Sequence, residues 1–527
     1  MTAVNRFQTY AIAGVAAAAL ILLTAVHLDS QGAYYDELHQ APAAFHYIGS
    51  HPVMFTWPHH GIPLLNMTYS AAIKSTIYGA YLRVADPHFS ITSWRLLGIA
   101  FVAAGLFCFF MIAGASLRFQ SAVLFGLLLL SDISVLVTTR HDWGPTALAL
   151  ALRLVFIGLW LSLALNATTD KSQRWKFALV GLVVGLSILE KLSSIVLIAP
   201  LGILLLTTRT RDKKGWRWAI AGLMLGTLPL VIGNIATYGK GHGFISLSEA
   251  TTDKGDLGTF AYIYDYLSIG QGQLPRALVF GDVPNAWFGW SEAAALTALL
   301  IIVCVAAIRR SESGASLRLG SALVATYAAL AIAFPLIPHP TFVHHWIVAT
   351  PFQYAAIALA LPALKDNKNA RRLFVAIAVF LIVMRIPNLI TVEQSFASGK
   401  ASDRYDGAYN KLMRLAATRS KDALFISSDW GSATQIYCGS NGQDDFVYEP
   451  FWNADSAQTV RDITSQTHKR VLYVVTTGIG AQFAASSAAT IDALTQSRTW
   501  QSSPVEPEFA NTGPIQIRKF VRSVEGN

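Results

Sequence analysis

Two adjacent acidic residues, Asp36 and Glu37, follow an apolar run at residues 7–28 that is long enough to cross a membrane. A carboxylate at this boundary can accept the proton that an attacking hydroxyl or amine releases, so Asp36 is a candidate general base. Glu37 is a second candidate catalytic residue, which either orients Asp36 or faces solvent. Asp142, in "TTRHDWGPTALAL", is a third: it could bind an acceptor or share the work of the base, or be only a polar group at a helix end.

Basic residues are predicted at the same membrane level as these acids. Lys191 follows Glu190 at a turn between two apolar runs, and its ammonium could stabilise the charge of a phosphate leaving group. The alternative is that Lys191 only extends to the membrane surface. Further candidates for binding a donor phosphate are His59, His60, His344 and His345. These histidines could hold a divalent metal, but they lack the spacing of a metal site. We therefore predict no cofactor and keep a divalent metal as the less favoured alternative.

Two charges fall deeper within apolar runs. Asp132 precedes the loop around Asp142 by about ten residues, and Arg153 follows that loop by about as many, which places both at the same depth on adjacent helices at about 1.5 Å per residue. We expect a buried ion pair between them, with a contact to substrate as the alternative. Arg385, near the end of the last apolar run, is expected to anchor that helix at the membrane surface rather than bind a ligand.

The composition indicates a polytopic membrane protein. The 527 residues are 53% hydrophobic and 13% charged, against about 25% charged residues in soluble domains. The net charge of +9 comes from short basic clusters between apolar runs, a pattern that sets membrane orientation and attracts anionic lipid rather than nucleic acid. The three cysteines are too few for a disulfide framework.

The apolar runs predict about eleven membrane-spanning helices, since about 20 residues cross a bilayer core. Basic clusters occur in alternate loops, which puts the N-terminus in the cytoplasm, the C-terminus outside and the candidate acids and histidines at the outer face of the plasma (inner) membrane. The first run lacks a convincing cleavage site, so we expect a retained helix. The runs are residues 7–28, 92–113, 120–139, 145–165, 176–190, 192–208, 218–238, 287–308, 319–337, 344–363 and 373–390.

Two domains are expected. Residues 1–392 form the transmembrane domain, with long outer loops at 29–91 and 239–286, the first of which contains a stretch suited to lying at the membrane surface. Residues 393–527 have the composition of a soluble extracytoplasmic α/β domain. Strands are predicted in "DALFISSDWG" and "KRVLYVVTTGIG", and helices in "NADSAQTVRDITSQTH" and "AASSAATIDALTQS". The segment "TTGIGAQF" lacks the third glycine of a dinucleotide-binding fingerprint.

An ordered set of short motifs runs through residues 7–390. In chain order these are "YYDELHQ", "HHGIPLLNMTYSAAIKSTIYG", "SWRLLGIAFVAAGLFCFF", "GLVVGLSILEKLSSIVLIAPL", "LPLVIGNIATYGKGHGF" and "HHWIVATPF". Together they resemble the GT-C glycosyltransferases, specifically the group of protein O-mannosyltransferases (glycosyltransferase family 39) and the aminoarabinose transferase of lipid A. One departure is that the lysine often found before the second motif is not obvious, and His59 and His60 stand there instead.

The resemblance implies an inverting glycosyltransferase with a GT-C-like fold. Such an enzyme takes a hexose or pentose from a polyprenyl-phosphate donor at the outer face and passes it to a protein, lipid or glycan, with Asp36 as the general base. Three alternatives stay open: a flippase of lipid-linked sugars, a noncatalytic scaffold, and an oligosaccharyltransferase-like or ligase-like enzyme with a diphosphate donor and a metal. The chain has no ATP-binding motif, which argues against a primary pump.

Overall fold

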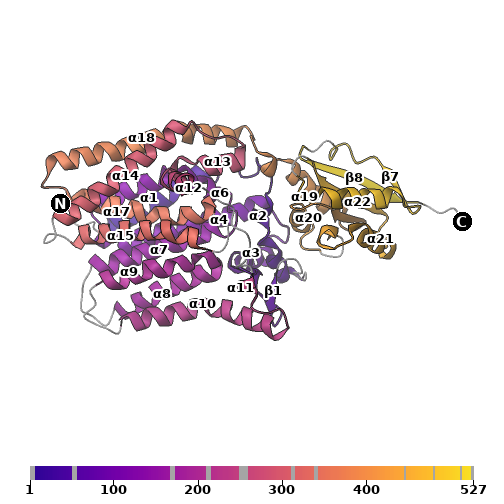
Figure 1. The fold of residues 1–527 in the computed structure, drawn as a ribbon, viewed down its shortest axis with the longest axis horizontal. Helices are drawn as coiled ribbons and strands as arrows, with labels where there is room; N and C mark the ends of the chain where they lie inside the picture. The colour runs from indigo at the N-terminus through magenta and orange to yellow at the C-terminus, as the bar shows by residue number, and fades with distance from the viewer. Residues whose placement is uncertain are drawn as a thin grey trace.

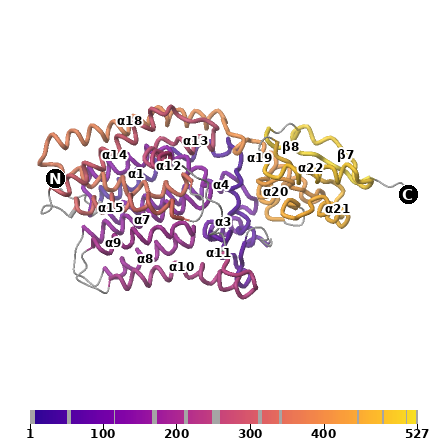
Figure 2. The backbone as a smooth tube through the Cα atoms, in the orientation of Figure 1, coloured from indigo at the N-terminus to yellow at the C-terminus, as the bar shows by residue number. Residues whose placement is uncertain are grey.

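A bundle of long helices makes up most of the computed structural model, and a smaller domain with a sheet lies at one end of it (Figure 1). Figure 2 shows the chain running back and forth along the bundle before its last part enters this smaller domain. The N-terminus lies at the opposite end of the bundle, so we call the end beside the smaller domain the domain end. The structure describes residues 6–49, 56–165, 173–208, 215–248, 259–309, 315–337, 342–443, 447–478, 481–510 and 513–523.

Within these described ranges, eight helical segments are long and apolar enough to cross a membrane. The prediction of a polytopic helical membrane protein is therefore confirmed. The segments are α1 (Arg6–Thr24), α4 (Ile91–Ala113), α7 (Thr146–Leu165), α10 (Gly215–Gly239), α14 (Ala286–Arg309), α15 (Ala315–Ala333) with η7 (Phe334–Leu336), α16 (Val343–Trp346) with η8 (Ile347–Ala349) and α17 (Thr350–Ala363), and α18 (Lys368–Ala397).

The other three apolar runs are helical but bent or short. Helices α5 (Phe119–Leu130) and α6 (Ile133–Arg140) meet at a bend of 62° and would count as a ninth crossing if they form one span. Asp132 lies at the bend and caps α6, because its carboxylate accepts a hydrogen bond of 2.9 Å from the Val135 amide. Helix α8 (Arg174–Glu190) and the pair η4 (Leu192–Leu197) and α9 (Ile198–Thr207) are the shortest. The count of eleven crossings stays a prediction.

The first loop folds into small elements at the domain end of the bundle (Figure 1). They are α2 (Tyr35–Leu38), η1 (Ala41–Ile48), α3 (Ile73–Val84) and an antiparallel sheet of β1 (Trp57–His59), β2 (Ile62–Met67) and β3 (Ser70–Ala71). This sheet was not predicted from the sequence, since its strands are only two to six residues long. His60 and Gly61 form the turn between β1 and β2, both with positive φ (47° and 80°), as a tight hairpin requires.

The second long loop also contains helices. These are α11 (Ile245–Ser248), α12 (Thr259–Leu267), η6 (Ile269–Gln271) and α13 (Gln273–Phe280). Both long loops therefore contain regular elements rather than open chain.

The smaller domain has the predicted α/β character. Its five-stranded sheet has the order β5-β4-β6-β8-β7, in which β4 pairs in parallel with β5 and β6, and β8 is antiparallel to its neighbours. Helix α18 continues to Ala397, beyond the expected domain boundary at residue 392. The domain's elements are η9 (Asp403–Tyr405), α19 (Ala408–Arg419), β4 (Ala423–Ser427), α20 (Ala433–Gly439), β5 (Val447–Tyr448), η10 (Pro450–Trp452), α21 (Ser456–Gln466), β6 (Val471–Thr477), α22 (Ala484–Thr495), β7 (Trp500–Ser503) and β8 (Ile515–Arg522).

Glycines allow α8 and α10 to pack backbone against backbone. A Cβ atom at Gly181 would overlap the Ala219 carbonyl, and one at Gly222 would overlap the Ala178 carbonyl. Small residues at such contacts let membrane helices approach closely and gain dispersion energy. Moving the two helices apart would therefore lose the dispersion energy of this contact.

We expect Gly222→Ala to destabilise the protein by about 1–3 kcal/mol, because the added methyl group forces α8 and α10 apart. Gly202→Ala is the matched control: Gly202 is also helical, but a Cβ atom added there would meet no other atom within 4 Å. It should be neutral or stabilise by up to about 1 kcal/mol, because alanine is the better helix former. Thermal unfolding in detergent compares the two, and equal stability of both variants would contradict the packing argument.

Candidate active site

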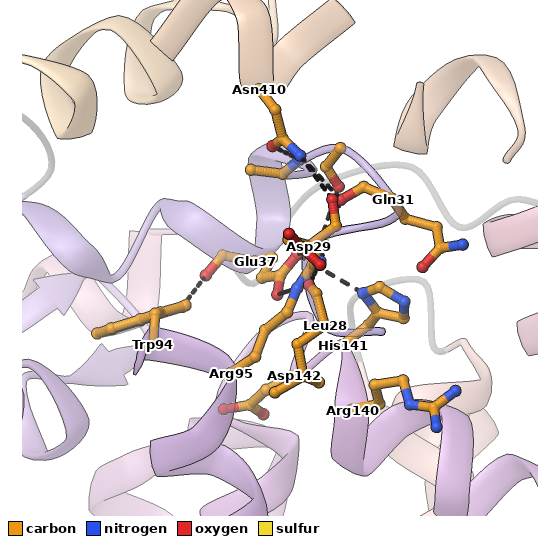
Figure 3. Close-up of polar contacts among 12 residues, drawn as sticks. Leu28, Asp29, Gln31, Glu37, Trp94, Arg95, Arg140, His141, Asp142 and Asn410 are labelled. Atoms are coloured by element: carbon orange, nitrogen blue, oxygen red, sulfur yellow. Dashed lines mark hydrogen bonds and ion pairs between the residues drawn. The ribbon is translucent and has the colours of Figure 1, made fainter. Parts of the chain in front are cut away.

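A buried ion pair fixes the loop that carries the predicted acids. Arg95, on α4, donates to both carboxylate oxygens of Glu37, with Nε–Oε1 2.6 Å and Nη2–Oε2 2.8 Å, and both side chains are fully buried. The same guanidinium donates to the carbonyl oxygens of Leu28, Gln31 and Gly32 (Figure 3). Arg95 thus holds the chain between α1 and α2 against α4.

Glu37 is ionised in this setting. Burial raises its pKa, but the charge and hydrogen bonds of Arg95, with a smaller contribution from His141, bring the pKa of Glu37 down to about 2. The His141 Nδ1 atom lies 3.9 Å from Glu37 Oε2, and burial lowers the pKa of His141 to about 3, so the imidazole is neutral. A carboxylate so strongly held is a poor proton acceptor at neutral pH.

The smaller domain holds the same loop from the other side. Asn410, on α19, accepts a hydrogen bond of 3.1 Å from the Ala33 amide and donates to the Asp29 and Gln31 carbonyls (Figure 3). Gln435, on α20, donates to the Ala33 carbonyl at 2.9 Å. The chain just before Asp36 therefore lies between the bundle and the smaller domain.

Asp36 is the accessible member of the three predicted carboxylates. Its side chain is 38% exposed, against 0% for Glu37 and 1% for Asp142. Its backbone carbonyl accepts a hydrogen bond of 3.0 Å from Gly144, which fixes α2 against the loop before α7. Asp36 Oδ1 lies 3.9 Å from Nδ1 of His39, whose pKa burial lowers to about 4. His39 was not selected from the sequence, although it stands three residues after Asp36.

Asp142 is paired with Lys74, a residue that was also missed from the sequence. Lys74 Nζ, on α3, lies 2.7 Å from Asp142 Oδ2, and both side chains are 1% exposed. The other carboxylate oxygen accepts a hydrogen bond of 2.7 Å from Ala147 at the start of α7. Lys74 also lies 4.0 Å from the ring centroid of Trp94. Lys74 is the single lysine of residues 29–91, so it could have been chosen as a candidate site residue. It was not chosen because a lysine on an amphipathic helix usually faces solvent.

Lys191 lies close to the acids, as expected from the sequence. Its backbone pairs with Ser70 of β3, which brings η4 to the first loop. Burial lowers the pKa of Lys191 to about 8, and the carboxylates of Asp36, Asp142 and Glu190 oppose that shift. Lys191 is therefore mostly charged at neutral pH, and its ammonium group is within electrostatic reach of both Asp36 and Asp142.

A pocket joins Lys191 to two of the four predicted histidines. His344 and His345, on α16, contribute to its wall, whereas His59 and His60 lie at the β1–β2 hairpin and are not among its lining residues. Among the described residues, no group of three or more His, Cys, Asp or Glu side chains is placed to hold a metal ion. The pocket is lined by Thr146, Ala149, Arg153, Lys191, Ser193, Ser194, Val196, Phe334, His344, His345 and Val348.

The predicted ion pair between Asp132 and Arg153 is wrong. Asp132 Oδ2 instead accepts a hydrogen bond of 2.6 Å from the Tyr354 hydroxyl, and Arg153 Nη2 donates to Ser194 Oγ at 2.9 Å. Counting depth along straight helices failed because the chain bends at Asp132 between α5 and α6.

Arg385 is not a surface anchor either. It is fully buried, and its Nη2 atom lies 2.6 Å from Glu292 Oε1. Arg385 Nη1 donates to the Leu128 carbonyl at 3.0 Å, so the side chain joins α18 to α14 and α5. Glu292 was not predicted as its partner, since the two residues are far apart in the chain.

We expect Glu37→Gln to destabilise the protein by about 3–5 kcal/mol at pH 7, because it leaves the Arg95 charge buried without a partner. The pKa of Glu37 is lowered from its ordinary value of 4.5 to about 2 in the folded protein. The stability that ionised Glu37 contributes is therefore complete above pH 4.5 and is lost as the pH falls toward 2. Free energies of unfolding in urea should therefore converge for wild type and variant on acidification. The control is Glu508→Gln at an exposed site, and equal stability of the two variants at pH 7 would count against the anchoring role.

Comparison with known proteins identifies the fold. No family model and no curated protein matches the sequence. Among solved structures, the chain is similar to ArnT from Cupriavidus metallidurans bound to undecaprenyl phosphate, with a TM-score of 0.61 and 12% identity over 97% of this chain and 98% of that one. The apo structure of ArnT gives a TM-score of 0.58 at 12% identity, over 96% and 97% of the two chains. The chain thus has the GT-C fold that its motifs implied.

Proposed function

We propose that the protein is an inverting glycosyltransferase that moves a sugar from a polyprenyl-phosphate donor to an acceptor, with Asp36 as the general base. The observation that carries this proposal is the position of Asp36: a half-exposed carboxylate beside the buried ammonium of Lys191, which lines a pocket with two histidines. A proton acceptor and a phosphate-binding cation are the two parts that such a transfer needs.

The fold supports the class of donor. ArnT, which shares the fold over nearly its whole length, has been solved with undecaprenyl phosphate bound. Eight helices in the described ranges are long and apolar enough to cross a membrane, the environment in which a lipid-linked donor is found. A shared fold at 12% sequence identity does not identify the sugar or the acceptor, because substrate choice depends on the site rather than on the fold.

In the proposed reaction, an acceptor hydroxyl or amine attacks the anomeric carbon of the donor sugar. The new bond forms on the face opposite the phosphate, and the bond from the anomeric carbon to the phosphate oxygen breaks with its electron pair going to that oxygen. Asp36 takes the acceptor proton, while Lys191 and the pocket histidines, His344 and His345, stabilise the departing phosphate. The phosphate leaving group is stable as an anion, so its oxygen needs no proton from a general acid.

The other acids have supporting roles in this scheme. Glu37 positions Asp36 through Arg95, and Asp142 fixes the start of α7 while its charge is balanced by Lys74. We place the domain end at the outer face of the plasma (inner) membrane, with the N-terminus in the cytoplasm, because the basic clusters of the sequence lie in the opposite loops. The smaller domain, which follows α18, is then extracytoplasmic.

We expect Asp36→Asn to reduce sugar transfer by about 10²–10⁴-fold, since the amide cannot accept the proton. Asp86→Asn is the matched control, because Asp86 lies in the same loop with its side chain 50% exposed and should leave transfer unchanged. The assay follows transfer from undecaprenyl-phosphate-linked sugars in membranes that contain each variant. Full activity of Asp36→Asn would remove Asp36 from the mechanism, whereas sugar-lipid translocation without transfer in the wild type would favour a flippase.

We expect the kcat/KM for the donor to fall as the pH rises above about 8, where Lys191 loses its charge. The sign follows from the lowered pKa: the ammonium form binds phosphate and predominates below pH 8, and the neutral amine predominates above it. Lys191→Arg keeps the charge throughout, so its alkaline limb should disappear even if its activity at pH 7 is reduced. An unchanged alkaline limb in Lys191→Arg would assign the titration to another group.

A further inference from the structure

Arg153 is a buried cation, and some of its donor groups have no partner in the part of the chain that the structure describes. It is fully buried on α7, and its one hydrogen bond within the described residues goes from Nη2 to Ser194 Oγ at 2.9 Å. Its Nε and Nη1 atoms have no hydrogen-bond partner there, and neither forms an ion pair with a described carboxylate. An arginine stays protonated in a protein, so this charge is buried without a carboxylate partner among the described residues.

The pocket around Arg153 is made for an anion. Its lining holds two cations, Arg153 and Lys191, two histidines and the hydroxyl groups of Thr146, Ser193 and Ser194, with no carboxylate. Every cationic group there can only donate hydrogen bonds, and the hydroxyl groups can donate as well. A phosphate, which only accepts hydrogen bonds when fully ionised, complements such a set and suits a guanidinium in particular.

Apolar residues complete the wall and indicate what accompanies the anion. Ala149, Val196, Phe334 and Val348 lie among the same lining residues. Thr146, Ala149 and Arg153 follow one another at helical spacing, so one face of α7 supplies all three to the pocket wall. A charged group attached to a hydrocarbon chain fits this combination better than a free inorganic ion does.

We propose that Arg153, oriented by Ser194, binds the phosphate of the donor lipid together with Lys191. This inference rests on the proposed function for the identity of the lipid, and it assigns Arg153 a binding role that the Asp36 reaction scheme does not require. The phosphate then lies between Lys191, which is near Asp36, and Arg153, which is farther along α7. Two cations at different depths would fix the orientation of the phosphate. The sugar is attached to that phosphate, so its anomeric carbon would be held in one orientation toward Asp36.

The test measures binding of undecaprenyl phosphate to the full-length protein in detergent, without any sugar transfer. Arg153→Gln should weaken binding by at least about tenfold, since a charge-assisted contact is lost. Arg153→Lys should recover part of the affinity. The control is Arg371→Gln on α18, where Arg371 donates to Gln120 and is not among the pocket-lining residues, so binding should be unchanged. Undecaprenol, which lacks the charge, should bind all four proteins equally weakly.

Thermal unfolding without ligand separates binding from a purely structural role. A structural arginine would lower the melting temperature when replaced, whereas Arg153→Gln removes an uncompensated buried charge and should leave the melting temperature equal or higher. Undecaprenyl phosphate should raise the melting temperature of the wild type and not that of Arg153→Gln. Inorganic phosphate giving the same shift would identify free phosphate as the ligand and overturn the lipid assignment.

The results also separate this inference from the proposed function. Unchanged affinity of Arg153→Gln and Arg153→Lys for undecaprenyl phosphate would overturn the role of Arg153, even if transfer depends on Asp36. Arg153-dependent binding in a protein that transfers no sugar from any donor would support the phosphate site and refute the transferase. A fall in the ligand-free melting temperature with unchanged affinity would assign Arg153 to holding η4 through Ser194.

Discussion

The site depends on the buried ion pair between Glu37 and Arg95. Separating these charges would leave each of them in a low-dielectric interior, so the pair acts as a fixed point between the first loop and α4. Because Arg95 also binds three carbonyl groups of the preceding chain, the entire exit from α1 is fixed. Asp36, next to Glu37, is thereby held with its side chain half exposed.

Buried charges in this protein divide into those with a partner and those without. Asp142 is balanced by Lys74, and Glu292 by Arg385, at distances of 2.7 and 2.6 Å. Arg153 has no described carboxylate partner and lines the pocket with Lys191. Since burying an unpaired charge is costly, the unpaired position is where a ligand contributes most. The proposed phosphate site follows from this contrast.

The smaller domain is part of the framework of the site rather than an attachment to the bundle. One hydrophobic cluster contains Ala33 and Leu38 of the first loop together with the interior of the five-stranded sheet. The ring centroids of Tyr35 and Trp430 are 4.3 Å apart, so the residue before Asp36 packs directly on the smaller domain. A movement of this domain would therefore be transmitted to Asp36 itself.

The sequence alone was sufficient for the features that depend on local composition. Apolar runs predicted the bundle, and the patterns of the last part of the chain predicted the α/β domain. The position of charges at run ends predicted that Asp36, Asp142 and Lys191 lie near one another, whereas their roles stay predictions. Each of these signals lies within a single segment, where hydropathy and periodicity are enough. The resemblance of the short motifs added the GT-C fold, which the structural likeness to ArnT confirmed.

Only the tertiary structure decided which charges meet. Glu37 and Arg95 are 58 residues apart and Lys74 and Asp142 are 68 apart, so their pairing depends on how the first loop folds onto α4 and α7. The bend at Asp132 misled a depth count that assumed straight helices, and a hairpin that local periodicity did not reveal placed His59 outside the pocket lining. The pairing of buried charges depends on packing, because packing decides which charges are buried together. A buried charge left unpaired costs free energy, so each one requires a partner nearby.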